Sequence, residues 1–161
     1  MTLPVLSFVC LFAGIACVLV AGVFLAFSDF IMRGLAQAEP VAGIDAMQQI
    51  NRTVLRSVFL FLFFALAPIT AAIAGYAWFR VDSDAQPLMI GAAAIYLVTV
   101  VAVTVVGNVP MNERLAAMPK AGDSAATYWP RYCQVWTWLN HVRTLGSTSA
   151  AICLLLAATL S

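Results

Sequence analysis

The chain has 161 residues, of which 63% are hydrophobic and only 9% are charged, and its formal net charge is +1. This apolar content exceeds what a soluble domain of this size needs, so the composition predicts an integral membrane protein. The sequence contains no basic cluster, which excludes nucleic acid as a partner.

The first predicted span covers residues 3–27, which is long enough to cross a hydrocarbon core of about 30 Å. The first basic residue is Arg33. The segment therefore lacks the positive region that opens a cleaved signal peptide, and we expect it to remain as a span. Asp29 follows it, four residues before Arg33. This carboxylate either pairs with Arg33 at the membrane edge or stands at the mouth of a site.

A short extra helix is predicted in the first loop, over residues 43–56, and we expect it to run directly into the second span, residues 57–79. Gln48, Asn51 and Arg52 share one face of this helix by their spacing. They are the first group of candidate ligand-binding residues.

The third predicted span covers residues 87–109 and ends in a polar stripe. Thr104, Asn108 and Asn112 recur at steps of four residues along it. Pro110 disfavours a helical conformation at the residue before it. The sequence therefore predicts a kink or a helix end beside the two asparagines.

The fourth helix is predicted to be extended, with residues 130–143 leading into a span over residues 144–160 that reaches only about 25 Å. Five side chains recur along it at steps of three or four residues and share one narrow stripe: Trp129, Tyr132, Trp136, Asn140 and Arg143. A helix that buries such a line must offer it partners or a ligand.

The resulting fold class is all-α, a single transmembrane domain over residues 1–161 that forms a four-helix bundle. Four spans place the first and third loops on one side, and the second loop with both termini on the other. The first and third loops carry the basic residues apart from Arg80. The positive-inside rule therefore predicts that these loops are cytoplasmic and that both termini lie outside, and we expect the bacterial inner (plasma) membrane.

This topology gathers the polar candidates at one membrane face, where they predict a pocket between helix ends. The candidates are Asp29, Gln48, Asn51, Arg52, Asn108, Asn112, Asn140, His141 and Arg143. A structural interpretation competes with this one. Asn and Gln join transmembrane helices, and Trp and Tyr form belts at the membrane interface.

Two motifs then resemble the anthrone oxygenase-like family of small membrane proteins. They are Asn108-Val-Pro-Met-Asn112-Glu113-Arg-Leu115 and Trp129-x2-Tyr132-x3-Trp136-x3-Asn140-His141-x-Arg143. The four spans and Gln48-x-Ile-Asn-Arg52 fit this family too, so the resemblance covers nearly the whole chain. It implies oxidation of an anthrone with O2 to an anthraquinone, with no metal or flavin cofactor. Much of the family has no known function, so the substrate stays open.

Oxidation of this kind needs a base, a group that stabilises the resulting anion, and an aromatic slot for a flat ring system. The slot would be formed by Trp129, Tyr132 and Trp136. The asparagines at 108, 112 and 140 would donate hydrogen bonds to a carbonyl or anion. Arg143 or Arg52 would add positive charge.

His141, the only histidine, is the natural base at neutral pH. It is rotated about 100° from Asn140, away from the stripe. Asp29 is the alternative base. A lone histidine gives no two-His metal site, and we expect no metal, although Asp29, Glu113 and His141 remain as an alternative carboxylate-rich site.

The four cysteines form no C-x-x-C motif, which argues against a thiol oxidoreductase. A second functional hypothesis is a non-catalytic protein that binds a lipid, a quinone or an apolar metabolite in the same pocket. The expected partners are an apolar aromatic small molecule or lipid, together with membrane lipids, and a homo-oligomer is compatible with the sequence.

Overall fold

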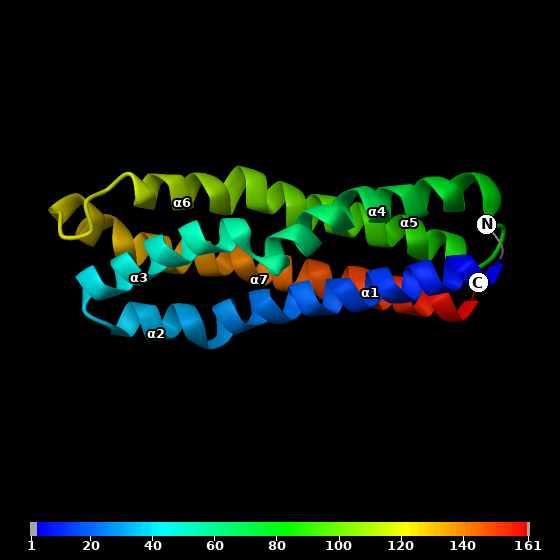
Figure 1. Ribbon diagram of the computed structural model, residues 1–161, viewed down its shortest axis with the longest axis horizontal. Helices are drawn as coiled ribbons and strands as arrows, with labels where there is room; N and C mark the ends of the chain where they lie inside the picture. Colours follow the sequence, from blue (N-terminus) through cyan, green and yellow to red (C-terminus); the bar gives the residue numbers. More distant parts are fainter. Residues whose placement is uncertain (1–2, 161) are drawn as a thin grey trace.

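A computed structural model describes residues 3–160, and these residues form an all-helical bundle with no strand (Figure 1). Four helical segments in this range are long and apolar enough to cross a membrane: Val5–Gln37, Val58–Arg80, Ala85–Ala116 and Asp123–Leu160. The all-α prediction is confirmed. Both termini lie at one end of the bundle, and the turns after α2 and α6 lie at the other (Figure 1).

Several of the long segments are built from more than one helical element. In chain order these are α1 (Leu3–Ala26), a π-helical turn (Phe27–Ile31), α2 (Met32–Gln37), α3 (Pro40–Thr53), a 3₁₀ turn (Val54–Arg56), α4 (Val58–Arg80), α5 (Ala85–Ile95), two π-helical turns (Tyr96–Ala102 and Thr104–Asn108), α6 (Val109–Ala116) and α7 (Asp123–Leu160).

The core has two parts that follow the two ends of the bundle. Near the termini it is apolar and includes Cys10, Leu66 and Leu154. At the other end it is built on aromatic side chains of α7, such as Tyr132 and Trp136. Large apolar side chains cover much of the outer surface, as a lipid-facing surface requires.

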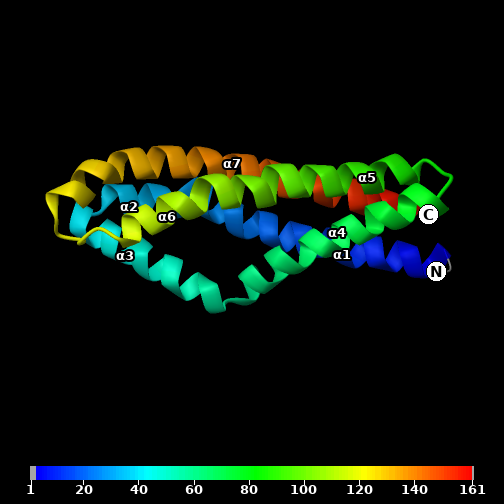
Figure 2. The same ribbon diagram turned by 90° about the horizontal axis from the view of Figure 1, so that it is seen from above.

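The extra helix α3 does not run directly into α4, contrary to the prediction. It begins at Pro40, which suits a first helical turn, and the chain breaks at Ser57, whose backbone is extended (φ −94°, ψ 152°). The Ser57 hydroxyl donates to the Val54 carbonyl at 2.7 Å and accepts from the Leu60 amide at 3.1 Å, so it caps α4. The chain forms an elbow there (Figure 2), and α3 packs back toward α6 and α7.

The third span does not end at Pro110 either. Val109 keeps helical angles (φ −62°, ψ −51°), and the helix continues to Ala116. A π-helical turn over Thr104–Asn108 comes directly before Val109 and Pro110. Because a proline ring clashes with the carbonyl four residues earlier in a regular α-helix, the wider π turn gives the ring room.

The fourth helix is longer than predicted. α7 begins at Asp123 and continues through Pro130 to Leu160, a length of 38 residues. At about 1.5 Å per residue it reaches roughly 57 Å. All five side chains of the predicted stripe, Trp129 to Arg143, are buried on its inner face.

Candidate functional site

A cavity of about 350 Å³ is lined by residues of α1, α3, α4, α6 and α7 and of the turns beside them. Its size falls in the range of roughly 300–1,000 Å³ that is typical of small-molecule sites. The wall is mostly apolar, with Phe24, Phe27, Phe59, Leu60 and Phe63 among its residues. The polar residues of the lining are Gln48, Asn51, Arg52, Thr104, Asn108, Asn112, Glu113, Trp136 and Arg143.

Arg143 is a buried cation in the cavity wall, with only 5% of its surface exposed. Its guanidinium lies over the ring of Phe24 at 4.4 Å and that of Trp136 at 5.1 Å. Nη2 donates to the Asn140 Oδ1 at 2.6 Å, and Nη1 donates to the Thr104 hydroxyl at 3.4 Å. These contacts fix the direction of the guanidinium.

No carboxylate neutralises Arg143 within the described residues. The two ion pairs there, Arg33–Asp29 and Lys120–Asp45, lie elsewhere. The Arg143 Nε atom is buried without a hydrogen-bond partner. A buried charge is costly unless it is paired, so this part of the cavity favours an anionic ligand group.

Asn140 lies behind the cavity wall and holds Arg143 in place. It is fully buried, and its Nδ2 donates to the Phe24 carbonyl at 2.6 Å and to the Ser28 hydroxyl at 2.5 Å. Its Oδ1 is the atom that accepts from Arg143. Asn140 therefore positions the cation and is not part of the lining.

Asn112 has a similar positioning role on α6. Its Oδ1 accepts from the Tyr132 hydroxyl and from the Trp136 indole, each at 2.8 Å. The Asn51 amide reaches the same Tyr132 hydroxyl at 3.5 Å. This network joins α3, α6 and α7 beside the cavity.

The three aromatic residues of the stripe stack on one another and do not form an open slot. The rings of Trp129 and Tyr132 are 5.5 Å apart and nearly parallel, and those of Tyr132 and Trp136 are 6.3 Å apart. Side chains three and four residues apart on one helix face meet in this way. Of the three, only Trp136 reaches the cavity, and phenylalanines of α1 and α4 form the aromatic wall.

His141 and Asp29 both lie outside the cavity lining. His141 is exposed on the outer face of α7, where its ring meets Trp138 edge-on at 6.0 Å. Asp29 has 68% of its side chain exposed and pairs with Arg33 at 3.8 Å. The described residues include no group of three or more His, Cys, Asp or Glu that could hold a metal ion.

Glu113 is the one carboxylate among the described lining residues. It lies on α6 directly after Asn112, at the exposed end of the cavity. From the sequence, Glu113 was predicted only as a possible metal ligand. The sequence feature that could have pointed to Glu113 as a lining residue is its place beside Asn112 in the Asn108–Leu115 motif.

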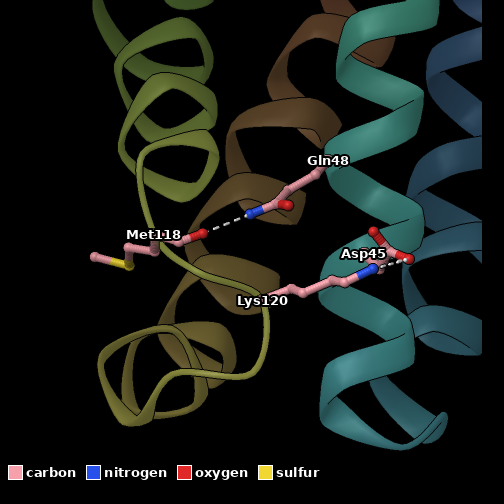
Figure 3. A network of polar contacts seen from close by, with 4 residues as sticks. All are labelled: Asp45, Gln48, Met118 and Lys120. Atoms are coloured by element: carbon pink, nitrogen blue, oxygen red, sulfur yellow. Dashed lines mark hydrogen bonds and ion pairs between the residues drawn. The ribbon is translucent and has the colours of Figure 1, made fainter.

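Three contacts fasten α3 to the end of α6 and to the loop after it, and Figure 3 shows two of them, Gln48–Met118 and Asp45–Lys120. The Gln48 amide donates to the Leu115 carbonyl at 2.8 Å and to the Met118 carbonyl at 3.0 Å. Lys120 pairs with Asp45 at 2.9 Å, and the hydrogen bond from its ammonium lowers the pKa of the Asp45 carboxyl. The Gln48 amide thus forms its hydrogen bonds with backbone carbonyl groups at the end of α6 and just beyond it.

The family model for anthrone oxygenase matches residues 46–153. The chain belongs to the anthrone oxygenase family. No curated protein and no solved structure gives a match. In this anthrone oxygenase family member, the matched range includes every polar residue of the cavity lining, from Gln48 to Arg143. The cavity is thus built mainly from the part of the chain that the family shares.

Proposed function

We propose that this family member oxidises an apolar aromatic carbon acid with O2 in the cavity, without a metal or flavin. The observation that carries the proposal is Arg143, a buried cation with no carboxylate partner in the described residues, in the wall of an apolar cavity of small-molecule size. An ionisable residue at membrane depth is by default a candidate functional residue.

The chemistry fits a ring CH2 next to a conjugated carbonyl. Loss of one C–H proton leaves an anion delocalised onto the carbonyl oxygen, which Arg143 stabilises. O2 then accepts four electrons as the CH2 becomes a second carbonyl. One oxygen atom enters the product and the other leaves as water, so no further reductant is needed.

Asn108 adds a second polar contact one helical turn from Thr104. Its amide donates to the Trp136 carbonyl at 3.3 Å, while its Oδ1 is buried without a partner. A substrate hydroxyl near the anionic oxygen would donate to this atom. Phe24, Phe59 and Phe63 would contact the faces and edges of the rings.

The lengths of the helices support a position at one membrane interface. α4 has 23 residues and reaches about 35 Å, close to the thickness of a hydrocarbon core of about 30 Å. The cavity lies at the Phe59–Phe63 end of α4, where apolar substrates partition from the bilayer. With the positive-inside rule, this is the cytoplasmic face of a bacterial inner membrane.

The test uses the protein in nanodiscs, with anthrone as the probe. We expect O2 uptake and anthraquinone formation, and Arg143→Met should lower the turnover rate by about 10²-fold because the anion loses its charge partner. Arg33→Met, at the exposed ion pair with Asp29, is the matched control and should keep full turnover.

Two results would overturn this proposal. One is full turnover in Arg143→Met. The other is a wild-type protein that binds anthrone tightly without consuming O2, which would favour the non-catalytic binding of a lipid, quinone or apolar metabolite.

A further inference from the structure

We propose that Glu113 is the catalytic base of this cavity, an inference that rests on the proposed oxidation. Breaking the C–H bond requires a proton acceptor within hydrogen-bond reach of the substrate. The other polar lining residues contribute amides, a hydroxyl, an indole and guanidinium groups. None of these offers a strong proton acceptor, whereas the oxygens of a carboxylate can accept a proton from the substrate.

The surroundings of Glu113 leave its carboxylate available. In residues 3–160 its side chain has no hydrogen bond and no ion pair with the protein, and it does not pair with Arg143. The backbone that carries it is fixed, because the preceding residue, Asn112, is held by both Tyr132 and Trp136. The helix that carries this lining residue is therefore held in place beside the cavity.

Glu113 and Arg143 line the same cavity at different levels of the bundle. Arg143 is held at the level of Thr104, and Glu113 follows Thr104 by nine residues on the same span. At about 1.5 Å per residue this separation is roughly 13 Å along the helix, before the two side chains reach toward each other. Carboxylate and guanidinium can therefore contact two ends of one ring system without neutralising each other.

The proton transfer conserves atoms and charge. The substrate C–H bond breaks, and its proton forms an O–H bond with a carboxylate oxygen of Glu113. The electron pair stays on the substrate and delocalises through the conjugated rings to the carbonyl oxygen beside Arg143. O2 is the oxidant that subsequently accepts the electrons, as in the proposed reaction.

The experiment separates proton removal from oxidation by excluding O2. Wild-type protein in nanodiscs is incubated with anthrone in D2O under nitrogen, and deuterium entry at the acidic carbon is measured by mass spectrometry. We expect exchange above the protein-free rate. Glu113→Gln should lower this catalysed rate by about 10²-fold or more, and Glu113→Asp should retain part of it.

Glu39→Gln is the matched control, because Glu39 is the other glutamate of the sequence and is exposed outside the cavity. It should exchange at the wild-type rate. Anthrone binding, followed by quenching of tryptophan fluorescence, should be unchanged in Glu113→Gln, which shows that the variant is folded.

Exchange at the wild-type rate in Glu113→Gln would overturn the assignment of the base, while leaving the oxidation itself intact if O2 uptake persists. A wild-type protein that binds anthrone but neither exchanges its proton nor consumes O2 would overturn both the base and the proposed function.

Discussion

At the scale of single residues, the site depends on one polar side chain that would not contact the ligand. Asn140 uses both ends of its amide, donating to Phe24 and Ser28 and accepting from Arg143. It thereby links α1 to α7 and directs the guanidinium toward the cavity. The residue that touches the substrate in our proposal is Arg143, and Asn140 acts through it.

Replacing Asn140 by alanine should remove these hydrogen bonds and leave the buried Ser28 hydroxyl and the Arg143 guanidinium with fewer partners. We expect the free energy of unfolding to fall by about 1–3 kcal/mol, with a loss of turnover. Thermal unfolding in detergent measures the first effect. Thr148→Ala is the control, since its exposed hydroxyl bonds only within α7; an Asn140 variant as stable as this control would contradict the account.

The residue scale is also where sequence reasoning was most and least successful. The helical period placed the stripe from Trp129 to Arg143 on one face, which is buried. It also placed His141 off that stripe, and the structure shows this histidine exposed. The helical period could not show that the rings of Trp129, Tyr132 and Trp136 stack on one another and leave no open slot, because stacking depends on rotamers and on the neighbouring helices. Glu113, which we propose as the base, was considered in the sequence only as a metal ligand, because a single carboxylate forms no helical repeat that would single it out.

At the scale of elements, the site depends on departures from regular helix. The Ser57 break allows α3 to pack back beside the cavity, and the π-helical turn before Val109 lets Pro110 sit within a continuous span. Pro110 and its neighbouring asparagines marked the second place in the sequence, whereas the break at Ser57 was not predicted. Tertiary packing decides whether a helix breaks or widens at such a place, so the local sequence pattern could not predict which of the two occurs.

Close helix packing gives a prediction at this scale. A Cβ on Gly146 of α7 would lie 2.8 Å from the Thr99 Cβ and 3.2 Å from the Val100 Cγ2, on the π-helical turn that faces it. Gly146→Ala should therefore push these helices apart and lower the free energy of unfolding by about 1–3 kcal/mol.

Gly75 of α4 offers the matched control for this substitution, because a Cβ there would meet nothing within 4 Å. Gly75→Ala should be neutral or stabilise the helix by up to about 1 kcal/mol. Equal unfolding temperatures for the two variants would show that Gly146 is not a packing contact.

At the scale of the whole molecule, the two parts of the bundle differ in their cores. The half near the termini has an apolar core, whereas the other half holds the cavity with its buried cation and its carboxylate. The fold class and the four spans followed from composition and period alone. A pocket lined by polar residues was predicted from the topology, but its apolar walls could not be, since they come from five helices whose relative positions the sequence does not encode locally.

We propose that the protein inserts one atom of O2 into an apolar carbon acid held in this cavity. The most direct measurement is mass spectrometry of the product after incubation of the wild-type protein with anthrone under ¹⁸O2. We expect anthraquinone with one ¹⁸O atom, formed faster than in matched samples without protein or with Arg143→Met. Anthraquinone formed at the protein-free rate, or with its new oxygen drawn from water, would contradict the account.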